Sequence, residues 1–163
     1  MDLHAIFEAL QSTPFAVAIA ESDTLFPIIE TVHVFALTLV VGSIAMLDLR
    51  LLQVSSRDIS VTQLSKEVLP WTWCCFALAA SSGFLMFSSK AVKYAGNFSF
   101  RAKMIMLLLA GTNMILFHLL TWRTVNHWDE HPRTPAAAKL AGGLSLLFWI
   151  CVVAFGRWVG FTL

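Results

Sequence analysis

The chain has 163 residues, of which 58% are hydrophobic and only 13% are charged, and its formal net charge is +1. Soluble domains carry about a quarter charged residues, so this composition excludes a soluble globular domain and indicates a membrane protein. The near-neutral charge gives no basis for binding nucleic acid or an acidic substrate.

Residues 1–22 are predicted to form an amphipathic segment that precedes the membrane-spanning part of the chain. This segment has no basic region at its start and no small-residue cleavage site, so we expect no signal peptide. Ser12-Thr13-Pro14 combines cap residues with a first-turn proline, which predicts a break between two short helices. These helices either lie on the membrane surface or pack on the end of the bundle.

Residues 23–163 are predicted to form four membrane-spanning helices. At ~1.5 Å per residue, a helix over residues 25–47 is about 35 Å long, enough to cross a bilayer. The expected spans are residues 23–53, 71–87, 100–122 and 136–158. The predicted fold is therefore an all-α membrane protein, with four transmembrane helices in an antiparallel bundle and an N-terminal amphipathic segment.

Helix start and stop signals mark the predicted boundaries of the second and fourth spans. Ser60 to Gln63 resembles a capping box, which opens a short amphipathic helix that we expect to end or kink at Pro70. Thr134-Pro135 predicts the start of the fourth span, with threonine as the cap and proline at the first helical position. Small residues at 79–83 and 142–145 are expected to let neighbouring helices approach closely.

Basic residues favour an orientation with both chain termini outside. The chain has no lysine or arginine before Arg50. Six basic residues follow the first and third spans, and the positive-inside rule places them in the cytoplasm; they are Arg50, Arg57, Lys66, Arg123, Arg133 and Lys139. Four others lie on the opposite side and count against this orientation: Lys90, Lys93, Arg101 and Lys103.

One face of the predicted first span carries its polar residues. Glu30, His33 and Asp48 fall on the same helical stripe, separated by the apolar residues Leu37, Val41 and Ile44. Charged groups inside a membrane are costly and usually face protein or water. We therefore expect this face to point into the bundle.

Polar residues of all spans fall on two levels. The level near the N-terminal side holds Glu30, His33, Lys103 and Arg157, and the opposite level holds Asp48, Arg50, His118 and Arg123. One interpretation is that these are structural ion pairs. In that case Glu30 pairs with Lys103 or Arg157, and Asp48 pairs with Arg50 or Arg123.

A functional interpretation is that His33 or His118 binds haem b, because imidazole is a usual axial ligand of haem. Lys103 and Arg157 could then bind the propionates, and Glu30 could orient the imidazole. The two histidines are expected to differ in depth by about 13 Å, so one iron cannot be ligated by both unless a helix shifts by about two turns. The remaining arrangements are a haem with a single histidine and a haem shared by two copies of His33 in a dimer.

Two other metal sites are compatible with the sequence. Glu30 and His33 have the i, i+3 spacing of a di-metal carboxylate bundle, but the other spans supply no second pair. His127 and His131 would share a helix face suited to Zn²⁺ or Cu²⁺, although they lie in a predicted loop and could simply be solvated.

Three motifs carry a resemblance to a known family. They are E-x-x-H from Glu30, G-S-x-x-x-x-D-L-R-L-L from Gly42, and F-R-x-K from Phe100 followed by Asn113 and Phe117-His118. In these the chain resembles a family of uncharacterised small bacterial inner-membrane proteins with four spans. It is more distantly similar to copper-resistance D-type and cytochrome b561-type membrane proteins. The resemblance implies a four-helix bundle in a bacterial inner membrane and transfers no catalytic residue.

Three functional hypotheses follow. The first is a small redox or metal-handling membrane subunit with His33 as ligand, acting as a homo-oligomer or with a membrane or periplasmic redox partner. The second is a structural or assembly subunit without a cofactor. The third is a transporter or proton path through Glu30, His33, His118 and Asp48, which requires a continuous polar cavity between the two levels.

Overall fold

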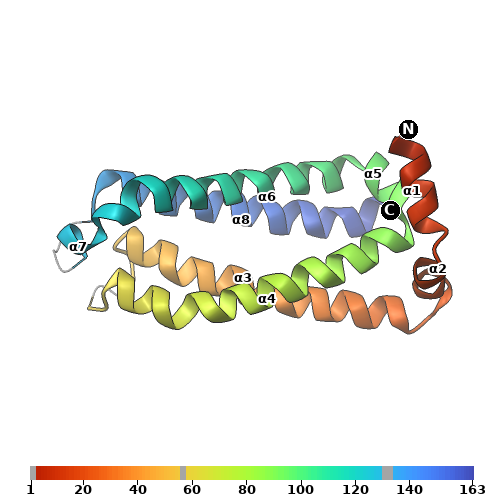
Figure 1. Ribbon diagram of the computed structural model, residues 1–163, viewed down its shortest axis with the longest axis horizontal. Helices are drawn as coiled ribbons and strands as arrows, with labels where there is room; N and C mark the ends of the chain where they lie inside the picture. The colour runs from red at the N-terminus through yellow and green to blue at the C-terminus, as the bar shows by residue number, and fades with distance from the viewer. Residues whose placement is uncertain (1–2, 56–57, 130–133) are drawn as a thin grey trace.

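The computed structural model describes residues 3–55, 58–129 and 134–163, and in these residues every regular element is helical. Four long helices form the body of the molecule and pack in two pairs (Figure 1). One pair is α3 (Leu25–Leu51) with α4 (Val61–Ser89), and the other is α6 (Phe98–Leu116) with α8 (Ala136–Thr162). The predicted fold class is confirmed.

The third span continues beyond α6 in a different geometry. A π-helical turn over Phe117–Thr121 and a 3-10 turn over Trp122–Thr124 extend it, and the short helix α7 (Val125–Trp128) follows. With this extension, all four spans are long and apolar enough to cross a membrane. The chain is therefore a multi-pass membrane protein, and both termini lie at the same end of the bundle (Figure 1).

Two short helices, separated at Thr13-Pro14 as predicted, lie at that end. Helix α1 (Leu3–Gln11) and helix α2 (Pro14–Glu21) are bent by 66° relative to each other. Helix α1 packs on α5 (Ala91–Gly96), and α2 packs on α4. Both helices thus pack against the end of the bundle (Figure 1), and their contact with the membrane surface stays a prediction.

An aromatic cluster joins the helices at this end. Phe87 of α4 stacks on Phe100 of α6 with ring centres 5.4 Å apart, and Phe7 of α1 meets Phe87 edge-on at 5.8 Å. Tyr94 of α5 is buried against Phe100 at 5.3 Å. Aromatic pairs of this kind add stabilisation beyond the area they bury, so the cluster fixes α1 and α5 over the spans.

Helix α4 corrects the expectation at Pro70. The sequence predicts an end or a kink there, but one helix runs from Val61 to Ser89 and includes Pro70. A proline removes one donor and leaves the carbonyl four residues earlier without its usual partner, and this is tolerated in membrane helices when neighbouring groups compensate. The Ser60 cap is confirmed, because its hydroxyl accepts from the Gln63 N–H at 3.1 Å.

The start of α8 differs from its prediction by one residue. Pro135 is the residue before the helix and not its first helical residue, and the side chain at this cap position makes no capping hydrogen bond. Helix α5 lies within the predicted loop between the second and third spans. Asn97 ends that loop and caps α6 by accepting from the Phe100 N–H at 3.0 Å.

A carboxylate from a distant segment caps the start of α4. Asp129 accepts from the backbone N–H of Val61 at 2.6 Å and of Thr62 at 3.1 Å, and also from the Thr62 hydroxyl. Beside it, Val61, Val125, Trp128 and others form a small buried cluster. The connection after the third span is thereby joined to the first helix pair.

The two pairs approach most closely where α3 crosses α8. A Cβ atom added at Gly142 would lie 3.1 Å from the backbone oxygen of Asp48 and 3.2 Å from the Cβ of Leu51. An apolar layer including Val40, Ala110, Trp149 and Val152 fills the bundle centre nearby. This layer separates the level of His33 from the level of Asp48.

Candidate functional site

His33 of α3 is held against α4 by two acceptors. Its Nδ1 lies 2.8 Å from the Ala79 carbonyl oxygen and 3.2 Å from the Ser82 hydroxyl. A carbonyl only accepts, so Nδ1 carries the proton and Nε2 presents a lone pair. A Cβ at Gly83 would come within 3.0 Å of the imidazole, so a glycine at this position gives the ring its room. The His33 ring thus packs against the run of small residues in α4.

Lys103 is the predicted cation whose charge reaches His33. It is half-buried on α6, and its charge acts on the imidazole electrostatically. The end of its side chain lies along α8, where a Cβ at Gly156 would be 3.5 Å from the ammonium nitrogen. Gly83 therefore makes space for the imidazole, whereas Lys103 packs along Gly156 at an ordinary contact distance.

Glu30 and Arg157, the other predicted members of this level, are both exposed. The guanidinium of Arg157 lies over the ring of Phe161 at 5.0 Å. Among the described residues neither forms an ion pair with the other or with Lys103. Lys103 therefore lies within electrostatic range of His33, Arg157 lies on the outer face, and the predicted ion pairs of this level are not found among the described residues.

Glu30 instead acts on Tyr94, which lies in α5 between the second and third spans. Burial raises the pKa of the Tyr94 phenol, and the nearby Glu30 carboxylate raises it further. Tyr94 is the single tyrosine of the sequence, so the ultraviolet absorbance of tyrosinate measures it alone. The electrostatic effect of Glu30 on Tyr94 therefore offers a test of where the Glu30 carboxylate lies.

We expect Glu30→Gln to lower the titration midpoint of Tyr94 towards the ordinary value of about 10. The phenol is neutral when protonated, so its contribution to folding stability is present below that ordinary value and is lost as pH rises through the higher folded value. Absorbance titration of the two proteins measures the difference. Glu67→Gln, at an exposed carboxylate of α4, is the control, and equal midpoints for all three proteins would contradict the placement.

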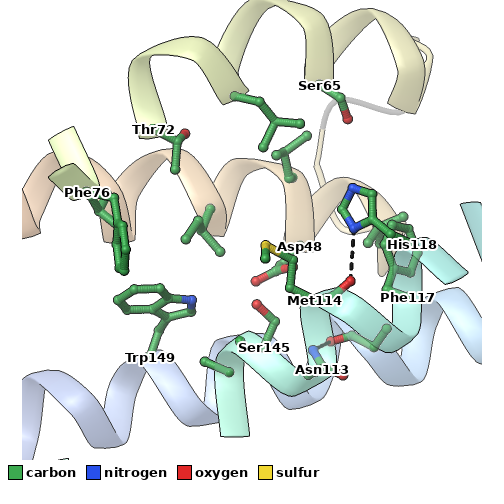
Figure 2. A pocket seen from close by; sticks show the side chains of 18 of the residues that line it. Asp48, Ser65, Thr72, Phe76, Asn113, Met114, Phe117, His118, Ser145 and Trp149 are labelled. Atoms are coloured by element: carbon green, nitrogen blue, oxygen red, sulfur yellow. Dashed lines mark hydrogen bonds between the residues drawn. The ribbon is translucent and has the colours of Figure 1, made fainter. Parts of the chain in front are cut away.

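The opposite level contains a cavity of about 310 Å³ between the helix pairs. Asp48 lines it and is only 5% exposed, and the Ser145 hydroxyl of α8 faces its carboxylate (Figure 2). In the part of the chain that the structure describes, Asp48 Oδ2 has no hydrogen-bond partner. The predicted pairing of Asp48 with Arg50 or Arg123 is therefore not found; Arg50 donates to the Ile59 carbonyl and Arg123 is exposed.

His118 lies on the same cavity, in the π-helical turn. Its Nδ1–H donates to the Met114 carbonyl at 2.9 Å (Figure 2), so the lone pair is on Nε2. π-Turns inside helices are frequent at functional sites. Asp48 and His118, which the sequence places on the same level, thus line one cavity. The sequence reasoning missed its aromatic walls, since Trp73, Phe76 and Trp149 carry no spacing signal that distinguishes a cavity from a packed core.

The two histidines occupy different levels, as their predicted depths imply. His33 contacts α4 at Ala79 and Gly83, whereas the cavity beside His118 is bounded on α4 by residues from Val61 to Phe76. Across the described ranges, no group of three or more His, Cys, Asp or Glu side chains gathers in a way that could hold a metal ion. His131 and the side chain of His127 lie outside the described residues, so this statement does not cover that predicted pair.

Comparison with known proteins gives a family but no function. No curated protein and no solved structure matches the chain, so the distant similarity to copper-resistance D-type and cytochrome b561-type proteins has no support. A family profile matches residues 22–162, which include all four spans. The chain belongs to that family, which is described as a family of unknown function, DUF6644.

Proposed function

We propose that this chain is a small integral membrane subunit for redox or metal handling, and that His33 binds a b-type haem or a metal centre. The observation that supports this most directly is the state of the His33 ring. Its Nδ1–H is directed to a backbone carbonyl at 2.8 Å, the usual arrangement in metal-ligating histidines. Its Nε2 forms no hydrogen bond within the described residues, so a lone pair remains for a ligand.

The surrounding residues suit such a group in their chemistry. Lys103 supplies a positive charge near His33 that could balance a propionate or another anion. Glu30 lies towards Tyr94 and is a secondary candidate, and Arg157 could contribute only after leaving Phe161. A bound haem would supply one-electron chemistry; the protein would supply the ligand, its orientation by Ala79, and the counter-charge.

The test is the absorption spectrum and metal content of protein purified after expression with ample haem. We expect a Soret band that disappears in His33→Ala and remains in His4→Ala, because His4 lies on α1 beside Glu8. A band lost only in His118→Ala would show that His118, at the level of Asp48, is the haem ligand in place of His33. Protein that is colourless and free of metal after such expression would refute the proposal.

The second candidate function is structural, and the same hydrogen bonds favour it. The bonds from His33 to Ala79 and Ser82 join α3 to α4 inside the first helix pair. In that case His33→Ala lowers the stability of the bundle, and His33→Gln, which keeps a donor, lowers it less. No ligand would then be found in the native protein.

A transporter or proton path has less support. The apolar layer of Val40, Ala110, Trp149 and Val152 lies between the two polar levels. The cavity lined by Asp48 and His118 does not include Glu30 or His33. A path through all four residues would have to cross this layer.

We also propose that the chain lies in a bacterial inner membrane with both termini outside, and that residues 1–22 contact the interface. The basic residues after the first and third spans support the outside location, and the position of both termini at one end agrees with their lying on the same side (Figure 1). Labelling of a cysteine introduced near either terminus by a membrane-impermeant reagent in intact cells tests it. Labelling that requires cell lysis would reverse the orientation.

A further inference from the structure

The cavity at the Asp48 level contains a buried acceptor that the protein leaves unsatisfied. Asp48 is 5% exposed, and its Oδ2 has no partner in the described chain. Buried polar groups are almost always hydrogen-bonded, and one left without a partner costs free energy. The cost is greater for a carboxylate inside a membrane span. A molecule that binds in the cavity could supply the missing partner.

The other polar groups of the cavity do not supply a positive charge. Among the residues that the structure describes, no lysine or arginine lines it. His118 presents the lone pair of Nε2, and Asn113 uses its N–H to donate to the Ala141 carbonyl at 2.9 Å, which leaves its oxygen as an acceptor. Ser145 offers one hydroxyl to Asp48. Asp48 is therefore the one residue with a formal charge among the described residues that line the cavity.

The walls are aromatic. Trp149 and Phe76 face each other across one side of the cavity, and Phe117 lies on the other side near His118 (Figure 2). Trp73 and Trp122 complete the aromatic lining. Aromatic faces attract cations and are a recurrent means of binding organic ammonium groups. An aromatic cavity with a carboxylate oxygen that lacks a partner in the described chain thus has the chemistry of a site for an organic cation.

Access is from the side of the bundle. Trp73, Met114 and His118 line the cavity and are all exposed on the molecular surface. They come from α4 and from the third span, which belong to different helix pairs and do not pack extensively on each other. An opening between these helices faces the lipid, so an amphipathic molecule could enter from the bilayer.

We propose that this cavity binds an apolar amine from the bilayer, with its ammonium group on the Asp48 carboxylate and its apolar part against Trp149 and Phe76. The volume of about 310 Å³ is at the lower end for small-molecule sites, which favours a compact ligand. This site is independent of the proposed cofactor at His33, because the apolar layer separates them.

The test compares phenylbutylamine with phenylbutanol, two probes of similar shape of which only the first carries a charge. Binding to protein in lipid nanodiscs is followed by tryptophan fluorescence, since three tryptophans line the cavity. We expect Asp48→Asn to raise the Kd of the amine by about tenfold or more and to change that of the alcohol by less than about threefold. Glu67→Gln, at an exposed carboxylate on α4, is the control and should change neither.

A second variant tests whether the probe occupies the cavity. Gly111 lines it, and a Cβ added there would meet nothing within 4 Å, so Gly111→Phe should fill the space and abolish binding of both probes. Amine binding that survives in Gly111→Phe would show that the probe lies elsewhere. Amine binding in Gly111→Phe would overturn the proposal. So would equal binding of both probes with no effect of Asp48→Asn, and so would a lack of binding of either probe.

Discussion

Gly142→Ala is expected to destabilise the bundle by about 1–3 kcal/mol. The added methyl group would lie 3.1 Å from the Asp48 carbonyl oxygen and 3.2 Å from the Leu51 Cβ, both closer than ordinary contact. Neither atom is the end of a flexible side chain, so α3 and α8 would have to move apart. Because close approach of backbones is a main source of helix association in membranes, the cost appears directly in the free energy of unfolding.

The adjacent glycine provides a matched control. A Cβ at Gly143 would meet only the end of the Leu52 side chain, at 3.9 Å, which is ordinary van der Waals contact. Equilibrium unfolding in mixed micelles, followed by circular dichroism, compares Gly142→Ala, Gly143→Ala and the unaltered protein. Equal stability of the two variants would show that the α3–α8 crossing is looser than the structure has it.

Asp129→Ala is expected to lower the free energy of unfolding by about 3 kcal/mol, because hydrogen bonds to a charged acceptor contribute about 1.5–3 kcal/mol each and are not fully additive. The variant leaves the N–H groups of Val61 and Thr62 without their acceptor at the start of α4. Negative charge at a helix N-terminus is also favourable, so Asp129→Asn should lose part of the same stability.

Asp58→Ala is the control for Asp129, because Asp58 lies in the same α3–α4 connection but is exposed. Its expected effect is within about 0.5 kcal/mol. The same unfolding experiment measures both, and hydrogen exchange of the Val61 and Thr62 amides locates the effect. An Asp129→Ala protein as stable as the Asp58→Ala protein would contradict the role of Asp129 as a cap.

Sequence periodicity predicted the spans and the inward face of α3. His33, Leu37, Val41 and Ile44 are all partly buried and Asp48 is buried, as one helical stripe requires. Glu30 belongs to the same stripe by angle but is exposed. It lies in the second turn of α3, at the end of the bundle where α1 and α2 pack (Figure 1). A helical stripe gives the direction of a side chain but not how far its neighbours extend.

Contacts between residues far apart in the sequence could not be predicted from sequence patterns. The capping of Val61 by Asp129 and the packing of Gly142 on Asp48 depend on which helices pair and at what height. Hydrophobic periodicity constrains neither. The π-helical turn at Phe117–Thr121 also has no sequence signal, because its residues fit an ordinary helix equally well. The cavity results from the pairing of the helices and from the π-helical turn, so it could not be predicted from the sequence either.

The two-pair architecture has a consequence for synthesis of the chain at the ribosome. Both helices of the first pair are completed before α6 and α8 are translated, and N-terminal units generally fold first. Until α8 inserts, the Asp48 carboxylate lies in the bilayer without the Ser145 hydroxyl and without the cover of Gly142. We therefore expect nascent chains that stop after Ser89 to be degraded faster than full-length protein in a pulse-chase experiment, and insertion of the last helix to decide whether a new molecule survives.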